Sequence, residues 1–399
     1  MLAAFFIFLG TYLVMAVGRL PGFRVDRTGA AIIGASLMIA FGVLSLEEAF
    51  RAVNYETLIL LFGLMIVVAN LRLSGFFTAV AAWVVEHAHR PLLLLAAIVV
   101  VSGVFSAFFV NDTMCLVLTP LVLEILTQLR RNPVPYLLAI AMAANVGSVA
   151  TITGNPQNMM IGTFSGIPYR VFAAHLAPIA GIGLVTTTVL IYLIYWKEFH
   201  DTSRVEISRT RVRVNRVLLW KSLVTAIFMI LFFFLGWPVS KVALVAGALL
   251  LITRRVKPEK VYREMDWQLL VLFVGLFIVV AGVEKTSLSE DLAQLAEHFK
   301  LGRPGVLSFF SVILSNLVSN VPAVLVFKPL VSQLPNQNRA WLTLAMSSTL
   351  AGNLTLLGSI ANLIVVERAR RTIRISFWEY LKVGVPLTVL TVWVGILLL

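Results

Sequence analysis

Charged side chains are scarce in this chain of 399 residues. Asp, Glu, Lys and Arg together make up 13% of it, whereas hydrophobic residues make up 59%. Average soluble domains carry about 25% charged residues, so the composition argues against a water-soluble protein. The chain instead contains about ten apolar runs of the length that a membrane-spanning helix needs, about 20 residues. We therefore expect an all-α polytopic membrane protein.

Other absences exclude whole classes of chemistry. Cys115 is the single cysteine, which excludes an internal disulfide. The five His residues do not cluster with Cys or carboxylates at the spacing of a transition-metal site. The sequence also lacks a Walker motif, a dinucleotide-binding fingerprint and a G-x-S-x-G motif. We expect neither an enzyme nor an ATP-driven pump, and no organic cofactor.

Acidic residues are outnumbered, with 19 Asp and Glu against 32 Lys and Arg. Most of the basic residues fall in one set of loops, above all between Lys197 and Lys221 and between Arg254 and Arg263. The positive-inside rule places these loops in the cytoplasm and both termini outside. The excess positive charge thus indicates how the chain is oriented in a cell membrane, which we expect to be a bacterial or archaeal inner membrane. Basic loops of this kind also attract anionic lipid headgroups. The excess charge does not indicate a nucleic-acid partner.

The chain repeats itself after about 200 residues. Three stretches return: Ala141–Gly162 returns from Ala345, FFVNDTMCLVLTPLV from Phe108 returns as LVSNVPAVLVFKPLV from Leu317, and FGLMIVVA from Phe62 returns as VGLFIVVA from Val274. We divide the chain into a first repeat (1–196), a cytoplasmic basic linker (197–216) and a second repeat (217–399). Because each half has an odd number of full spans, the second half enters the membrane inverted, as in many transporters.

Two paired segments, 91–130 and 304–334, are apolar except for a short polar stretch. This stretch is Asn111, Asp112 and Thr113 in the first segment, and Ser319, Asn320, Val321 and Pro322 in the second. We interpret both segments as re-entrant hairpins, each with its polar stretch at the tip. Non-helical backbone is tolerated at membrane depth only where protein or a water-filled cavity satisfies it, and helix ends exposed there can coordinate ions. The alternative is two tightly packed full spans with polar caps.

A second polar break interrupts the spans 136–162 and 340–365. The first copy reads TITGNPQN and includes Gly154 and Pro156, which do not continue a regular helix comfortably. The second copy reads TLLGSIAN, a milder break around Gly358. Paired breaks of this kind are the best sequence indication of a transporter's binding site. The alternative is a kink that packs through small residues against a neighbouring helix.

Two intramembrane charges are candidate functional groups. Asp112 lies at the first tip, where its carboxylate can bind a cation or carry a proton. Lys328 matches Thr119 in the repeat alignment and lies several residues from the second tip. Three roles are open for Lys328. It can pair with a carboxylate, it can attract an anion into a transport cavity, or it can extend its side chain to the membrane surface.

These motifs resemble those of the ion transporter superfamily, which includes citrate-transporter-like and divalent-anion permeases, arsenite efflux permeases and sodium/proton antiporters. The resemblance covers both halves and implies two re-entrant hairpins, two unwound helices and a homodimer. It places Asn111, Thr113 and Asn320 at substrate-holding positions, and Gly154 and Gly358 at the unwound breaks. Asp112 and Val321 depart from the Ser-Asn-Thr sequence at the tips of the carboxylate-transporting relatives. The Asn-Asp pair that begins the first tip is closer to the arsenite and antiporter branches.

The sequence thus predicts about ten transmembrane helices plus two re-entrant hairpins in an inverted-topology repeat. The expected function is secondary active transport of a small organic or inorganic anion, arsenite-like solutes included, coupled to H⁺ or Na⁺. The alternatives are a Na⁺/H⁺ antiporter that uses Asp112 and a channel-like or non-transporting membrane protein. The candidate substrate- and ion-binding residues are Asn111, Asp112, Thr113, Thr153, Gly154, Asn155, Asn158, Ser319, Asn320, Lys328, Gly358, Ser359 and Asn362. A coupling Na⁺ is expected near Asn111, Asp112, Gly154, Asn320 and Gly358.

Overall fold

The computed structural model describes the whole chain except residues 1, 19–21, 89, 201–213, 287–297 and 371. The described residues form helices joined by turns and loops, with no β-strand among them. This confirms the all-α polytopic membrane fold. Within the described part, six helices are long and apolar enough to cross a membrane, and further apolar helices are shorter.

The first half of the chain is a series of helices from α1 to α11. Their bounds are α1 (Leu2–Val17), α2 (Arg27–Ala40), α3 (Leu46–Ala52), α4 (Tyr55–Ser74), α5 (Phe76–His87), α6 (Pro91–Phe108), α7 (Asn111–Gln128), α8 (Val134–Ser148), the 3-10 turn η1 (Ile152–Gly154), α9 (Pro156–Ser165), α10 (Tyr169–Ile194) and α11 (Trp196–His200). Helix α11 begins one residue before the predicted linker and extends into it, and residues 201–213 of that linker lie outside the described part.

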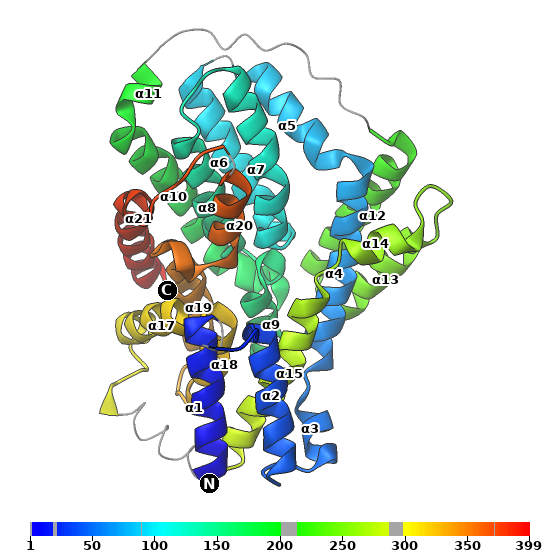
Figure 1. Cartoon of the computed structure of the whole chain (residues 1–399), viewed down its shortest axis with the longest axis vertical. Helices are drawn as coiled ribbons and strands as arrows, with labels where there is room; N and C mark the ends of the chain where they lie inside the picture. The colour runs from blue at the N-terminus through cyan, green and yellow to red at the C-terminus, as the bar shows by residue number, and fades with distance from the viewer. Residues whose placement is uncertain (1, 19–21, 89, 201–213, 287–297, 371) are drawn as a thin grey trace.

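The second half repeats this order from α12 to α21. Its elements are α12 (Arg216–Phe234), α13 (Val239–Leu251), α14 (Pro258–Arg263), α15 (Trp267–Glu284), α17 (Pro304–Val318), α18 (Asn320–Val331), α19 (Gln337–Leu350), the 3-10 turns η2 (Ala351–Asn353) and η3 (Leu356–Gly358), α20 (Ile360–Ala369) and α21 (Phe377–Leu398). In Figure 1, α1 to α3 lie at the lower end, α5 to α8 at the upper end, and α12 to α14 on the right.

The copied helices α4 and α15 begin alike and pack alike. Asn54 caps α4 and Asp266 caps α15, each through a side chain that accepts a backbone N–H of the first turn. A Cβ on Gly63 would lie 2.4 Å from the carbonyl carbon of Ala243 in α13, and one on Gly275 2.8 Å from that of Ala31 in α2. Glycine at this repeated position therefore lets α4 and α15 approach α13 and α2 backbone to backbone.

The two paired segments are helix–turn–helix units. Helices α6 and α7 are separated by Phe109 and Val110, so the turn comes just before Asn111, and the predicted tip residues form the first turn of α7. Helices α17 and α18 are separated by Ser319 alone, which adopts a left-handed φ of 81°. A non-glycine residue there is strained, and such strain concentrates at functional sites.

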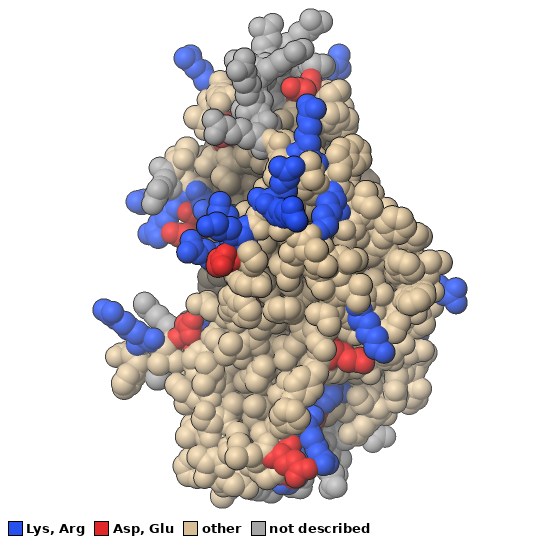
Figure 2. All heavy atoms as spheres, turned by 90° about the vertical axis from the view of Figure 1, so that its right-hand side faces the viewer, with Lys and Arg blue, Asp and Glu red and all other residues tan. Residues whose placement is uncertain are grey.

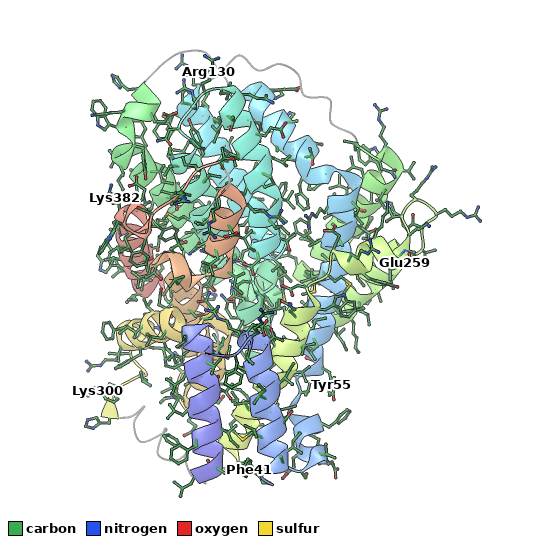
Figure 3. All side chains as sticks on the ribbon, in the orientation of Figure 1. Phe41, Tyr55, Arg130, Glu259, Lys300 and Lys382 are labelled. Atoms are coloured by element: carbon green, nitrogen blue, oxygen red, sulfur yellow. The ribbon has the colours of Figure 1, made fainter. Side chains whose placement is uncertain are left out.

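Charged side chains are unevenly distributed over the surface. In Figure 2, Lys and Arg gather in the upper part of the view, and a broad area below carries only scattered charges. Figure 3 places Arg130 and Phe41 at opposite ends of the longest axis. Many large apolar side chains are exposed, Trp220 and Phe228 of α12 among them. Apolar exposure on this scale is the expected surface of a protein surrounded by lipid.

Candidate functional site

Asn145, near the end of α8, is the centre of a buried network of amides and hydroxyls. Its Nδ2 donates to Oδ1 of Asn353 at 2.9 Å and to Oδ1 of Asn362 at 3.0 Å. Its Oδ1 accepts from Nδ2 of Asn111 at 3.1 Å and from Oγ of Ser359 at 3.0 Å. All five side chains are at most 5% exposed. One amide thus connects the first hairpin to the break in the second half of the chain.

Thr349 has the corresponding position in the second sequence copy and makes the corresponding contacts. Its Oγ1 accepts from Nδ2 of Asn155 at 3.0 Å and donates to Oδ1 of Asn158 at 3.3 Å. Nε2 of Gln157 donates to the same hydroxyl at 3.3 Å. Asn155 and Asn158 match Ser359 and Asn362 in the repeat alignment. Asn145 therefore bonds to the break of the second copy and Thr349 to the break of the first, so the two broken helices meet at one buried point.

Within each break, an asparagine satisfies the carbonyl groups that the helix leaves free. Nδ2 of Asn158 donates to the carbonyl oxygens of Ser148 at 3.1 Å and Thr151 at 3.2 Å. Nδ2 of Asn362 makes the same two bonds in the second copy, to residues 352 and 355, at 2.7 and 3.2 Å. A Cβ on Gly154 would lie 2.2 Å from the carbonyl oxygen of Ser148, so only glycine fits at that position.

Each hairpin is also fixed to the break in its own half. In the first half, Thr151 Oγ1 donates to the carbonyl oxygen of Ala107 at the end of α6. In the second half, Thr355 Oγ1 donates to Oδ1 of Asn316 in α17 at 2.9 Å, and Nδ2 of Asn316 donates to the carbonyl oxygen of Ala351 at 2.9 Å. Hairpin and break thus form one connected unit in each half.

The second hairpin leaves an unused acceptor. Asn320 is 9% exposed, and its Oδ1 is among the buried side-chain oxygens of the described chain without a hydrogen-bond partner. The neighbouring residue Pro322 accepts a hydrogen bond from the Tyr12 hydroxyl at 3.1 Å through its carbonyl oxygen. A buried amide oxygen without a partner is costly, and at a hairpin tip it is available to a ligand.

Asp112 and Thr113 do not join the amide network. They line a cavity of about 50 Å³ together with Arg72 of α4 and with Glu264 and Asp266 at the start of α15. We refer to it as the Asp112 cavity. Arg72 and Glu264 form an ion pair within it. The Asp112 carboxylate also interacts with the backbone N–H of Ala361 in the first turn of α20, where the helix dipole favours negative charge.

Lys328 lies apart from both groups. Its Nζ lies 3.0 Å from a carboxylate oxygen of Glu284 at the end of α15 and 5.2 Å from the ring centre of Phe164. It lines a cavity of about 380 Å³, which we refer to as the Lys328 cavity, with these two residues and with Arg51 and Asn54. Lys328 thus pairs with a carboxylate and also lines a cavity.

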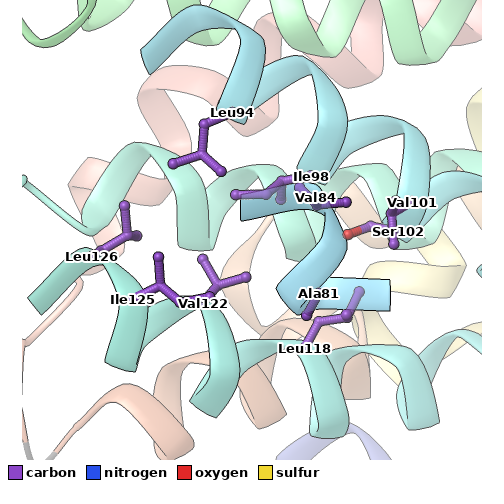
Figure 4. Close-up of a pocket in the computed structure, with 10 residues that line it drawn as sticks. All are labelled: Ala81, Val84, Leu94, Ile98, Val101, Ser102, Leu118, Val122, Ile125 and Leu126. Carbon is purple, nitrogen blue, oxygen red and sulfur yellow. The ribbon is translucent and has the colours of Figure 1, made fainter. Parts of the chain in front are cut away.

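The remaining candidates and pockets are less informative. Thr153 belongs to the first break, but its Oγ1 lies 2.9 Å from the Tyr169 hydroxyl and outside the Asn145 network. A pocket between α5, α6 and α7 is lined by apolar side chains and Ser102 (Figure 4), without a charged group in its lining. In the part of the chain that the structure describes, no three His, Cys, Asp or Glu residues group as a metal site. Oxygen ligands for a hard cation are instead found beside Asp112.

Sequence reasoning missed several members of the site. Asn145, Thr349 and Asn353 lie within the copied stretches but outside the TGNPQN and LGSIAN motifs, so their roles depend on contacts between halves. Glu264 and Asp266 lie at a helix start, where an acidic residue is ordinarily read as a cap. Glu284 lies at the end of α15, and the sequence did not identify it as the partner of Lys328.

The family profile for citrate transporters, CitMHS, matches residues 11–351. The chain belongs to this family. The silicon efflux transporter LSI3 of Oryza sativa subsp. japonica is 31% identical to it, over 97% of this chain and 95% of its own length. A 46 kDa membrane protein of Mycobacterium leprae is 30% identical, with the same shares of the two chains aligned. The putative transporter arsB of Dictyostelium discoideum is 24% identical, over 93% of this chain and 87% of its own.

A solved structure has the same fold. The YdaH transporter of Alcanivorax borkumensis superposes with a TM-score of 0.61, at 16% identity, over 100% of this chain and 97% of its own. At this level of identity the likeness concerns the fold alone. The family match and the relatives together confirm the superfamily that the motifs resemble, and the protein is a multi-pass membrane transporter of small solutes and not an enzyme.

Proposed function

We propose that this chain is a secondary active transporter that moves a small anion or oxygen-rich solute through the crossing point of its two broken helices, coupled to H⁺ or Na⁺. The observation that carries the proposal is the reciprocal bonding of Asn145 and Thr349, each to the break of the other copy. Buried amides and hydroxyls at membrane depth are expensive unless they are used. Here they bring together both helix restarts and the first hairpin.

The chemistry of this centre favours a solute rich in oxygen. Helices α9 and α20 restart there, and their first turns present backbone N–H groups that favour negative charge. Asn111 and Ser359 add an amide and a hydroxyl beside them. Citrate fits these donors as a carboxylate, and silicic acid and arsenite fit them as hydroxylated oxyacids. Silicic acid and arsenite come into consideration through the silicon efflux relative and the arsenite branch of the superfamily.

We assign ion coupling to Asp112. Its carboxylate lines a cavity with Thr113 and Asp266, where carboxylate and hydroxyl oxygens offer the ligand type that Na⁺ prefers. Protonation of the same carboxylate is the alternative means of coupling. The Asp112 cavity also favours a second candidate function, Na⁺/H⁺ antiport, since Asp112 and Asp266 face the same small space.

Uptake into proteoliposomes distinguishes these functions. The purified protein is reconstituted and offered labelled citrate, silicic acid or arsenite under an imposed H⁺ gradient, an imposed Na⁺ gradient or neither. Gradient-dependent uptake of one solute supports the proposal. Movement of Na⁺ against H⁺ without any solute supports the antiporter, and uptake that ignores both gradients supports a channel-like protein.

A further inference from the structure

The Lys328 and Asp112 cavities occupy equivalent positions in the two halves. The segment FGLMIVVA of α4 contributes Met65, Val68 and Ala69 to the Asp112 cavity. The copy VGLFIVVA of α15 contributes the matching Phe277, Val280 and Ala281 to the Lys328 cavity. Three positions beyond each segment, the next lining residue is Arg72 in α4 and Glu284 in α15.

The two cavities also lie at opposite ends of these helices. The Lys328 cavity combines residues before the start of α4 with the last turns of α15. The Asp112 cavity combines the last turns of α4 with the start of α15. Helices α4 and α15 are therefore antiparallel, with one cavity near each end of the pair. In an inverted repeat, equivalent cavities of this kind lie on opposite sides of a central site.

The charges of the two linings are opposite. Arg51 and Lys328 outnumber Glu284 in the lining of the Lys328 cavity, and Arg51 also pairs with Glu47 outside that lining. Asp112, Glu264 and Asp266 outnumber Arg72 in the Asp112 cavity, and Arg72 is already paired with Glu264. The lining of one cavity therefore favours anions and that of the other favours cations.

Lys328 is held so that an anion can reach it. Its side chain is 33% exposed and that of Glu284 is 29% exposed. An ammonium group has three donors, and a single carboxylate leaves donor capacity for a second acceptor. Partly exposed ion pairs are weak because water screens them, so an incoming anion can replace or join the carboxylate. The Phe164 ring at 5.2 Å supports the ammonium from one side without neutralising it.

We infer that the Lys328 cavity is an anion-binding entrance, in which Lys328 contacts the anion and Glu284 is the partner that the anion displaces. This inference rests on the proposed transport function, and it adds a binding site separate from the Asn145 network.

The charge of this entrance can be measured without transport. Ala281 lines the Lys328 cavity, so we place the reporter thiol there by Ala281→Cys, in a chain whose buried Cys115 is replaced by Cys115→Ala. The reaction rates with an anionic and a cationic thiosulfonate reagent of equal size are compared in the full-length protein. Each rate is divided by the rate of the same reagent with a free thiol in solution, which removes the intrinsic difference in reactivity between the two reagents.

At Ala281→Cys, the normalised rate of the anionic reagent is expected to exceed that of the cationic one. Lys328→Met should lower the anionic-to-cationic ratio about thirtyfold, because removing one charge about 4 Å from the reagent in water changes the rate of each reagent about fivefold, in opposite directions. Glu284→Gln should raise the ratio, and Lys328→Arg should preserve it.

A ratio that Lys328→Met leaves unchanged, or an Ala281→Cys thiol that neither reagent reaches, would overturn the inference. Because the readout requires no solute movement, a protein that fails to transport any tested solute still reports the charge of the cavity. Failure of this inference and failure of the proposed function are therefore separate results.

Discussion

Asn145 and Asn362 are 217 residues apart in the chain, yet Nδ2 of one lies 3.0 Å from Oδ1 of the other. The matching pair in the repeat alignment, Thr349 and Asn158, is joined at 3.3 Å. The same pairing therefore occurs twice, with the halves exchanged. Each broken helix restarts against a polar residue supplied by the other half, so the halves cannot separate at this point without leaving buried amides unpaired.

Asn145→Ala should therefore destabilise the protein and abolish transport. The substitution removes the partner of four polar groups at once, and an estimate of about 1–3 kcal/mol follows from leaving buried groups unsatisfied. Thermal unfolding in detergent and uptake in proteoliposomes measure the two effects. Asn70→Ala is the matched control, because Asn70 is equally buried in α4 but donates only within its own helix, to the carbonyl oxygen of Ile66. Equal effects of the two substitutions would contradict the role of the network.

Gly154→Ala should impair folding or transport because the new Cβ meets backbone rather than a movable side chain. The nearest atom, the carbonyl oxygen of Ser148, would lie 2.2 Å away. Gly181→Ala in α10 is the control, since nothing lies within 4 Å of a Cβ built there. That change should be neutral or stabilise the helix by about 0.5–1 kcal/mol. Normal expression, melting temperature and uptake of Gly154→Ala would show that the break tolerates a side chain.

Hydropathy and polar breaks were enough to predict the long apolar helices and the positions at which they are interrupted. The predicted span 136–162 appears as α8, η1 and α9, with the interruption between Ser148 and Pro156. Helix α5 (Phe76–His87) was not predicted, because Gly75 joins it to α4 and its 12 residues are too short for a span. The short helices α3 and α14 were missed for the same reason of length.

The candidate site was predictable in its motifs and not in its pairings. Asn111, Ser359 and Asn362 were singled out because amides and hydroxyls are unusual at membrane depth. The role of Asn145 in connecting them depends on how helices from the two halves pack. The sequence alone does not distinguish Asn145 from the other asparagines of the apolar segments. Thr153 was selected by the same argument and Lys328 as an intramembrane charge, yet they lie elsewhere, against Tyr169 and Glu284. Polarity indicates that a residue has a partner without identifying the partner.

Asp112→Asn should uncouple transport from the ion gradient more than it weakens solute binding. The change keeps the size of the side chain and removes its charge, so the pH dependence of uptake should become flat. Glu124→Gln, an exposed position on the same helix, should leave both properties unchanged. Initial uptake rates at several pH values and several imposed gradients measure the effect. Wild-type coupling in Asp112→Asn would exclude Asp112 as the coupling group.

The hairpin interpretation predicts which ends are accessible from the same side. Arg90 and Arg130 are exposed at the two ends of the α6–α7 pair, and Arg303 and Gln333 at those of the α17–α18 pair. Single Cys substitutions at these positions, in a Cys115→Ala background, should react with impermeant thiol reagents from one side within each pair. The two pairs should react from opposite sides. Reaction from opposite sides within one pair would contradict the hairpin, because the chain would then cross the membrane an odd number of times in that segment.

Secondary active transport is tested most directly by measuring whether the transported solute accumulates above its equilibrium concentration. The reconstituted protein is given an inward H⁺ or Na⁺ gradient and the solute that the uptake comparison identifies. We predict that the solute accumulates inside above its external concentration, that an ionophore which collapses the coupling gradient releases it, and that Asn145→Ala and Asp112→Asn both abolish the accumulation. Equilibration without accumulation, unaffected by the ionophore, would contradict secondary active transport by this chain.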